Sequence, residues 1–155
     1  MVDIRRVPLC MRSLAKDIQE LVQNASSMDK EEYLKRAVQL NYRFIRIHPF
    51  TDSNGRTSRA LLNMMTIPKG ILIEVSKEKK SEFVKAQRDT NIKMEEQGYF
   101  EALNDDLEEL KQIEQNTRES PTYEFIKQNC VVDVQSSENS TKEQQNEIIK
   151  QQEIE

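Results

Sequence analysis

Apolar residues recur at intervals of three and four along most of this sequence, and that spacing constrains the fold more than any other feature. Residues three and four apart share one face of an α-helix, so each apolar stretch predicts a helix with one buried side. The apolar positions of the five stretches are Met11, Leu14, Ile18, Leu21 and Val22; Leu34, Ala37, Val38, Phe44 and Ile45; Ala60, Leu61, Met64 and Met65; Phe83, Val84 and Ala86; and Tyr99, Leu103, Leu107, Leu110 and Ile113.

Capping and helix-ending residues separate these stretches. Ser26 or Asp29 can cap the second helix by accepting from the amides of its first turn. Residues 67–70, Ile-Pro-Lys-Gly, end the third helix, and residues 71–75 suit a short extended segment. We therefore predict an all-α protein, a helical bundle in which a central helix-loop-helix carries residues 48–59.

The length suits one domain with a tail. A chain of 155 residues is close to the usual domain size of about 150 residues. We expect a packed core over residues 1–115 and a polar linker or tail over residues 116–155, either flexible or forming an exposed helix. Residues 135–155 are rich in Gln, Glu, Ser and Asn, and such a composition buries too little apolar surface to offset the entropy of ordering.

Charge and composition exclude several classes of partner. The chain has 23 basic and 27 acidic residues and a net charge of −4, so no strong positive field favours nucleic acid or an anionic membrane. No apolar run reaches the roughly 20 residues of a membrane span, and the first residues do not resemble a secretory signal. Cys10 and Cys130 lack metal-ligand spacing and suit reduced, buried thiols. We expect a cytoplasmic protein that binds neither nucleic acid nor membrane.

The chain has only three glycines, Gly55, Gly70 and Gly98. A Walker-type loop needs two glycines five residues apart before Lys-Ser/Thr, and a dinucleotide fingerprint needs three glycines within six residues. Neither arrangement is present, so any nucleotide must be held in another way.

The segment His-Pro-Phe-Thr-Asp-Ser-Asn-Gly-Arg-Thr-Ser-Arg, residues 48–59, concentrates groups that suit phosphate chemistry. The amides of Asn54 and Gly55 lie at the start of a predicted helix, where unpaired N–H groups and the helix dipole attract an anion. Arg56 and Arg59 lie one turn apart on the same side, so both guanidinium groups can reach further phosphates.

Two other side chains complete this segment. Asp52 offers a hard oxygen ligand that suits Mg²⁺ bridging phosphates, and His48 is the only imidazole available to accept a hydroxyl proton. Each residue also has a purely structural interpretation: a satisfied histidine at a helix end, a common turn composition, and a solvated arginine pair. The convergence of all of them within twelve residues favours a functional site.

This segment resembles the core motif of the Fic family, His-Pro-Phe-x-(Asp/Glu)-Gly-Asn-Gly-Arg-x-x-Arg. The matching positions are His48, Pro49, Phe50, Asp52, Asn54, Gly55, Arg56 and Arg59. The preceding helix, the Leu-Leu-Asn-Met stretch and the Pro-x-Gly break are similar to the family core as well, so the resemblance covers roughly residues 7–115. It implies a Fic-like helical bundle.

The resemblance implies a protein adenylyltransferase that moves AMP from Mg-ATP to a Ser, Thr or Tyr hydroxyl of a target protein or of itself. It assigns His48 as the general base, Asp52 as the Mg²⁺ ligand, and residues 53–55 (Ser53, Asn54, Gly55) as the anion hole. Arg56 and Arg59 then bind the outer phosphates. Asn91 aligns with a family residue near adenine, although an Asn at a helix end is also a common cap, and Phe83 suits either the base pocket or the core.

The sequence departs from the family pattern in two places before the tail. Ser53 replaces a glycine, and a positive φ at this position would cost about 1 kcal/mol and place a hydroxyl in the anion hole. Family members often carry an upstream β-hairpin, the flap, that clamps the target peptide by strand addition. Residues 1–6 can supply one strand at most, so we expect the flap to be missing or truncated.

A third departure concerns inhibition. Many family members carry an inhibitory helix with the pattern Ser/Thr-x-x-x-Glu-Gly/Asn, whose glutamate pairs with the second motif arginine. Ser120 and Glu124 have this spacing, with Phe125 in place of Gly/Asn, and we hypothesise that Glu124 engages Arg59. A separate inhibitory partner or antitoxin and a homo-oligomer are also compatible with the resemblance.

Two alternative functions are weighed against transfer. A degenerate or truncated Fic fold would bind nucleotide or a partner without transferase activity, and Ser53 together with the missing flap favours that alternative. Helix-turn-helix binding of DNA through Arg56 and Arg59 is disfavoured, because the acidic chain lacks the accompanying phosphate contacts.

Overall fold

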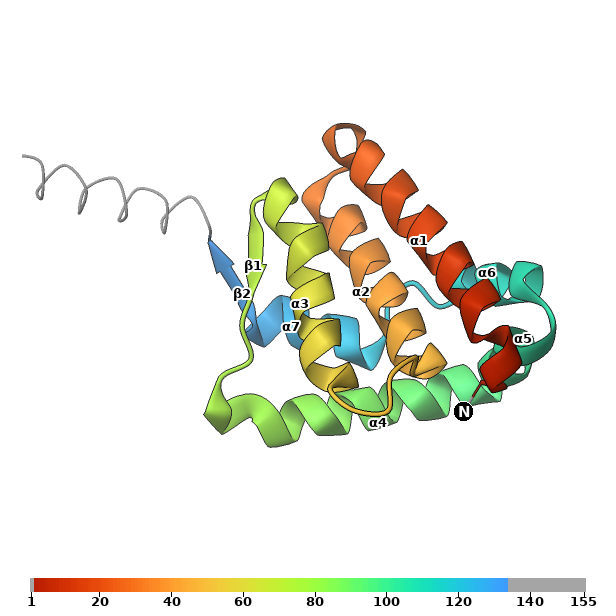
Figure 1. Cartoon of the computed structure of the whole chain (residues 1–155). Helices are drawn as coiled ribbons and strands as arrows, with labels where there is room; N and C mark the ends of the chain where they lie inside the picture. The colour runs from red at the N-terminus through yellow and green to blue at the C-terminus, as the bar shows by residue number, and fades with distance from the viewer. Residues whose placement is uncertain (1, 134–155) are drawn as a thin grey trace, which may run out of the picture.

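Helix α2 (Lys30–Ile47) is the central element, because eight consecutive residues, 37–44, are buried on all its sides. The computed structural model describes residues 2–133, and α2 lies between α1 (Val7–Gln23) and α3 (Asn54–Thr66) in Figure 1. Asp29 caps α2 by accepting from the Glu32 amide, as the sequence predicts. The predicted all-α fold is confirmed.

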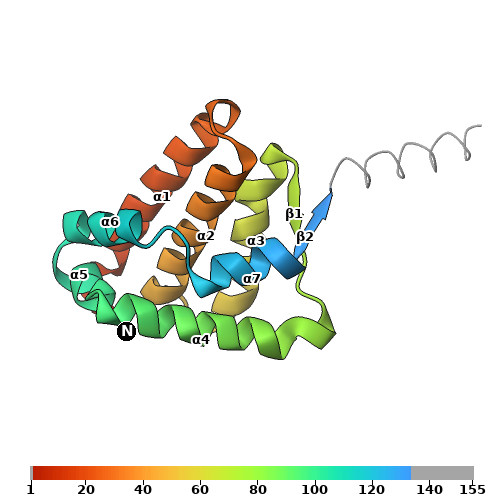
Figure 2. The ribbon, with the colours of Figure 1, turned by 180° about the vertical axis from the view of Figure 1, so that it is seen from behind.

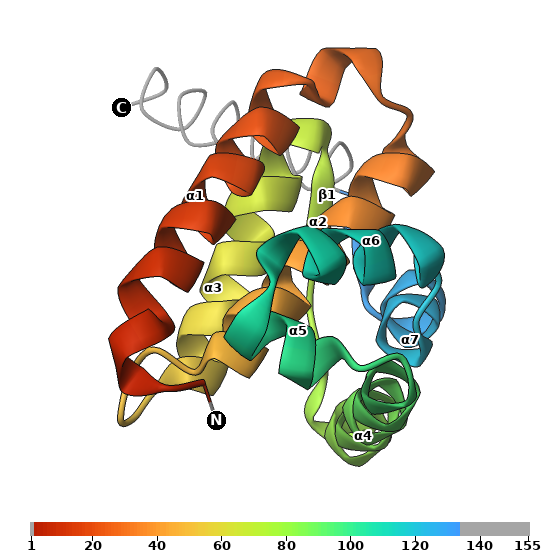
Figure 3. The same cartoon turned by 90° about the vertical axis from the view of Figure 1, so that its right-hand side faces the viewer.

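The remaining helices close the bundle around α2. Helix α4 (Lys80–Glu96) crosses beneath the lower ends of α2 and α3, and α7 (Pro121–Asn129) packs against α4 and α2 on the far side (Figure 2). Helices α5 (Tyr99–Asp105) and α6 (Leu107–Asn116) form the corner seen in Figure 3. Within residues 2–133, four short 3₁₀ helices precede or connect these helices: Ile4–Arg6, Ala25–Ser27, Ile67–Lys69 and Lys77–Lys79. Among the described helices, none has the length and apolar character to cross a membrane.

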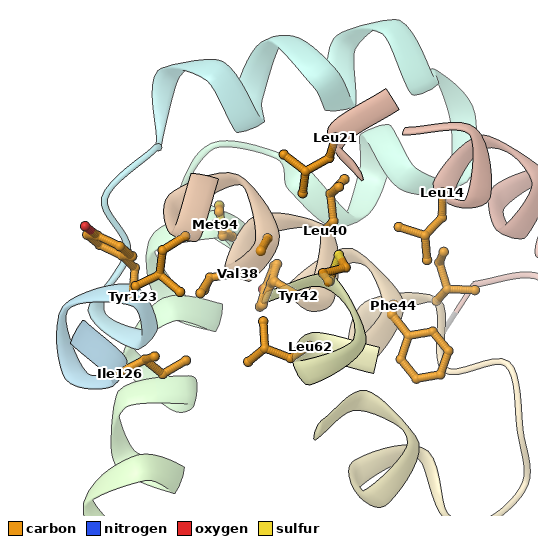
Figure 4. Packing of buried hydrophobic residues seen from close by; sticks show 14 of the residues in the cluster. Leu14, Leu21, Val38, Leu40, Tyr42, Phe44, Leu62, Met94, Tyr123 and Ile126 are labelled. Atoms are coloured by element: carbon orange, nitrogen blue, oxygen red, sulfur yellow. The ribbon is translucent and has the colours of Figure 1, made fainter. Parts of the chain in front are cut away.

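One hydrophobic cluster joins the helices (Figure 4). Burying each large apolar side chain contributes about 1.5–3 kcal/mol, so this cluster supplies the main driving force for folding. The labelled members are Leu14 and Leu21 from α1; Val38, Leu40, Tyr42 and Phe44 from α2; Leu62 from α3; Met94 from α4; and Tyr123 and Ile126 from α7.

A buried ionic cluster lies within this core and joins three of its helices. The Arg43 side chain is fully buried in α2, donating to Asp17 of α1 at 2.7 Å and to Glu114 of α6 at 2.5 Å. Burial raises the pKa of Glu114, and the facing Arg43 guanidinium opposes that shift. Removing one partner would leave uncompensated buried charge, so the three groups fix the relative positions of α1, α2 and α6.

The structure corrects three expectations about helices. The stretch from Tyr99 to Ile113 is two helices, because Asp106 has an extended backbone (φ −150°) and caps α6 by accepting from two amides. Ile45 is half-buried rather than fully on the inner face, and Met64 is 71% exposed on the outside of α3.

The packed part of the chain extends further than residue 115. Helix α7 buries Thr122, Tyr123 and Ile126 against the bundle, so the expectation of a flexible or exposed segment directly after residue 115 was wrong. Strand β2 (Val131–Asp133) then pairs antiparallel with β1 (Ile71–Ile73), which lies in the predicted extended segment. The predicted polar tail over residues 134–155 lies outside the described residues.

Candidate active site

A six-residue loop, residues 48–53, joins the lower ends of α2 and α3 (Figure 1). Its first and last residues have left-handed backbones, with φ +53° at His48 and φ +65° at Ser53. These two turns reverse the chain abruptly and bring the C-terminus of α2 close to the N-terminus of α3. Residue 53 therefore has the positive φ that the family pattern suggests, although it is not glycine.

Asn54 holds this loop in place. The residue is 8% exposed, and its side chain makes two hydrogen bonds with the backbone of Phe50: Nδ2 donates to the carbonyl at 2.6 Å, and Oδ1 accepts from the amide at 3.1 Å. Nδ2 also lies 3.3 Å from Nε2 of the exposed His48 ring. The Asn54 side chain thus positions the loop and the imidazole, and only its backbone amide is free to meet an anion.

The N-terminus of α3 is uncapped. A serine before a helix normally has an extended backbone and accepts from an amide of the first turn. The left-handed Ser53 instead accepts from Arg56 Nη2 at 2.7 Å, and no side chain among residues 2–133 caps α3. The amides of Asn54, Gly55 and Arg56 have no hydrogen-bond partner among these residues, so they can bind an anion.

Gly55 keeps this N-terminus accessible. A Cβ built on Gly55 would have no heavy atom within 4 Å, so the space beside its backbone is open to a ligand. Any side chain at this position would project into that space. The geometry therefore supports the assignment of an anion hole to the start of α3, formed by backbone amides rather than by side chains.

Asp52 is the one acidic side chain in this loop. Its Oδ1 accepts from the Ser53 amide at 2.7 Å, and the exposed carboxylate has its second oxygen available for a cation. No group of three or more His, Cys, Asp or Glu side chains among the described residues could hold a metal ion. This donor set fits Mg²⁺ held together with substrate phosphates, because Mg²⁺ usually keeps one or two carboxylates, phosphate oxygens and waters.

A cavity of about 410 Å³ brings the site residues together. His48 lines it from the loop, and Asn54, Gly55 and Arg59 line it from α3, whereas Arg56 lies outside its lining. The lining also includes Ile45, Ser58, Val75, Lys77, Lys80, Phe83, Val84 and Gln87. Sequence reasoning missed the two lysines, Lys77 and Lys80, whose only signal was the Lys-Glu-Lys-Lys sequence of residues 77–80 at the start of α4.

Asn91 lies beside this cavity rather than in it. A narrower cavity of about 110 Å³, lined by Asn91, shares Ile45, Phe83 and Gln87 with the larger one. The Tyr42 hydroxyl donates to Asn91 Oδ1 at 2.9 Å, so this asparagine is held from inside α4 rather than acting as a helix cap. Phe83 lines both cavities and also packs against the hydrophobic cluster, so both interpretations of this residue stay open.

The structure does not bring Glu124 to Arg59. Glu124 is on α7 and lines a separate depression with Lys85 and Asp89 of α4, and it forms no ion pair with Arg59. Other charged side chains near α7 do form ion pairs: Lys35 pairs with Glu119, and Lys127 pairs with Glu31. Inhibition through Glu124 remains a prediction that this arrangement does not support.

Comparisons with known proteins agree with the motif. A model of the Fic/DOC family matches residues 4–66. Protein adenylyltransferase fic-1 of Caenorhabditis elegans is 38% identical over 55 residues, which are 36% of this chain and 11% of that protein. The protein of the same name from Caenorhabditis briggsae is 46% identical over 37 residues, 24% of this chain and 7% of that protein. The match thus spans about a tenth of these relatives, and no solved structure matches significantly.

Proposed function

Because this chain belongs to the Fic/DOC family, we propose that it is a protein adenylyltransferase, which transfers AMP from Mg-ATP to a Ser, Thr or Tyr hydroxyl of another protein or of itself. One observation carries this proposal: a single cavity joins the imidazole of His48, the uncapped N-terminus of α3 and the guanidinium of Arg59. These are a base, an anion site and a cation, the groups that transfer of a phosphate-linked moiety requires.

The proposed role of α3 is to bind and orient the triphosphate. The amides of residues 54–56 and the positive end of the helix dipole hold one phosphate, and Arg59, which lines the same cavity, binds the next. Arg56, which donates to the Ser53 hydroxyl, is proposed to bind an outer phosphate as well. Mg²⁺ bound to Asp52 and phosphate oxygens would neutralise charge that develops on the leaving group.

His48 is the proposed general base. The oxygen of the target hydroxyl forms a bond to the α-phosphorus, the bond from that phosphorus to the oxygen leading to the β-phosphate breaks, and pyrophosphate leaves. The hydroxyl proton passes to the His48 imidazole. Asn54 Nδ2 lies 3.3 Å from His48 Nε2, so the Asn54 side chain helps to orient the imidazole toward the reacting groups.

Labelled ATP tests the proposal. The full chain is incubated with a protein extract, Mg²⁺ and ATP labelled on the α-phosphate or, separately, on the γ-phosphate. Protein-bound label from the α position alone, lost in His48→Ala and retained in the surface control Lys16→Ala, is the expected result. Label from the γ position alone would instead indicate phosphate transfer and contradict the proposal.

Ser53 favours one second candidate, a nucleotide-binding module without transferase activity. Its hydroxyl accepts from Arg56 Nη2 at 2.7 Å, and its left-handed, strained backbone lies next to the anion hole. Nucleotide binding without transfer, unchanged by Ser53→Gly, would support this candidate. Restored transfer in Ser53→Gly would show that the serine weakens an otherwise competent enzyme.

A further inference from the structure

We propose that Asn41 of α2, seven residues before the motif, determines base specificity by accepting a hydrogen bond from the exocyclic amino group of adenine. This inference rests on the proposed function, because it takes the nucleotide to bind with its phosphates at α3. It adds a residue outside the motif and assigns it a role in choosing the nucleotide.

The position of Asn41 carries the first step. The narrow cavity of about 110 Å³ lies between α2, α4 and α7, and it shares three lining residues with the larger cavity that holds His48 and Arg59. Asn41 lines only the narrow cavity. A nucleotide whose phosphates meet α3 therefore has this cavity as the adjoining space for its base.

The unpaired amide of Asn41 carries the second step. The residue is 8% exposed, and its Oδ1 is buried without a hydrogen-bond partner. A buried acceptor left unpaired costs about 1–3 kcal/mol, and most buried polar atoms in folded proteins have a partner. An asparagine in the middle of a helix, between Leu40 and Tyr42, gains nothing from the core. Oδ1 is closed off from solvent, so a ligand donor in the cavity would satisfy it once the Asn41 amide rotates toward the ligand.

Asn91 supplies the complementary donor. Its Oδ1 is occupied by the Tyr42 hydroxyl at 2.9 Å, which leaves Nδ2 without a partner among the described residues. Burial raises the pKa of Tyr42 to about 12, so the hydroxyl keeps its proton at neutral pH and continues to donate. Tyr42 thus fixes the orientation of the Asn91 amide, with its donor side unoccupied.

Together the two amides offer one acceptor and one donor to the base. Adenine carries an amino donor next to a ring nitrogen acceptor, which matches this pair. Purine riboside 5′-triphosphate has the same ring, ribose and phosphates without the amino group. It therefore removes one hydrogen bond and leaves the rest of the ligand unchanged, so the comparison isolates the Asn41 contact.

The test is a double-mutant cycle in which one change is made in the protein and the other in the ligand. Binding of ATP and of purine riboside triphosphate is measured by calorimetry in His48→Ala protein, which should not consume nucleotide, with and without Asn41→Leu. We expect ATP to bind about tenfold more tightly than the analogue when Asn41 is present, and equally tightly when leucine replaces it.

The outcomes separate the two proposals. ATP binding without discrimination in the Asn41 protein, or discrimination that persists in Asn41→Leu, would overturn the role of Asn41 and leave the proposed function standing. The first of these measurements needs no folded variant at position 41. Failure of either ligand to bind would overturn the nucleotide site and the role of Asn41 with it.

Discussion

Replacing Ser53 by glycine and by alanine isolates the strain at the start of α3. Both substitutions remove the hydroxyl that accepts from Arg56, so the two variants differ in how well each residue tolerates φ +65° and in the freedom that each gives the unfolded chain. The left-handed region costs a residue with a Cβ about 1–2 kcal/mol of conformational free energy, whereas it costs glycine almost nothing.

The expected difference follows from two opposing terms. Glycine relieves about 1–2 kcal/mol of strain and loses about 0.4–1 kcal/mol through the greater freedom of the unfolded chain. Ser53→Gly should therefore be more stable than Ser53→Ala by about 0.5–1 kcal/mol. For a domain of this size, that difference corresponds to about 1–4 °C in the melting temperature.

Thermal unfolding followed by circular dichroism measures the difference, and Ala60→Gly on the same helix provides the control. Ala60 is an exposed residue within α3, where glycine should destabilise by about 1 kcal/mol, so the sign of the glycine effect reverses. If Ser53→Ala were as stable as Ser53→Gly, residue 53 would not be left-handed in solution. A left-handed Ser53 could then not be the reason that α3 lacks a side-chain cap.

Three further substitutions or treatments test other parts of the structure. Asn54→Ala removes two hydrogen bonds to the loop backbone and should lower stability by about 2 kcal/mol in urea unfolding, with loss of transfer activity; unchanged stability would exclude the clamp. Arg43→Leu removes the main counter-charge of the buried Glu114 carboxylate, leaving only Arg36 Nη1 at 3.5 Å, and should cost about 3–5 kcal/mol, whereas a cost below about 1 kcal/mol would contradict the ionic cluster. Burial raises the pKa of the Cys10 and Cys130 thiols, so less thiolate is present at pH 8; alkylation should be slow in the folded protein and fast in urea, and equal rates would contradict their burial.

The sequence predicts the helices and the motif because both depend on local patterns. Apolar spacing within each helix and the order of residues 48–59 are visible without tertiary contacts. The division between α5 and α6 is hidden in the sequence because Leu107 continues the apolar spacing across Asp106, and only the extended backbone at Asp106 shows that the helix stops. Helix α7 is also hidden, because its short apolar face is stabilised by packing on α4 and α2.

Features that join distant segments cannot be read from the sequence. Arginine is a residue type that usually lies on the surface. The burial of Arg43 depends on Asp17 and Glu114, which lie 26 and 71 residues away in the sequence. Asn54 belongs to the motif, yet its role in holding Phe50 and His48 emerges only from the loop geometry. The left-handed Ser53 is foreseeable from the family pattern, because glycine at the equivalent position suggests a positive φ.

Intact-mass spectrometry after incubation with Mg-ATP tests the central claim most directly. The full chain and its His48→Ala variant are each incubated with Mg-ATP and the proteins of an extract, and the masses of the chain and of the modified proteins are compared. We expect addition of adenylyl groups with the wild-type chain and none with His48→Ala. Addition of phosphate, or adenylylation that persists without His48, would contradict transfer of AMP by this site.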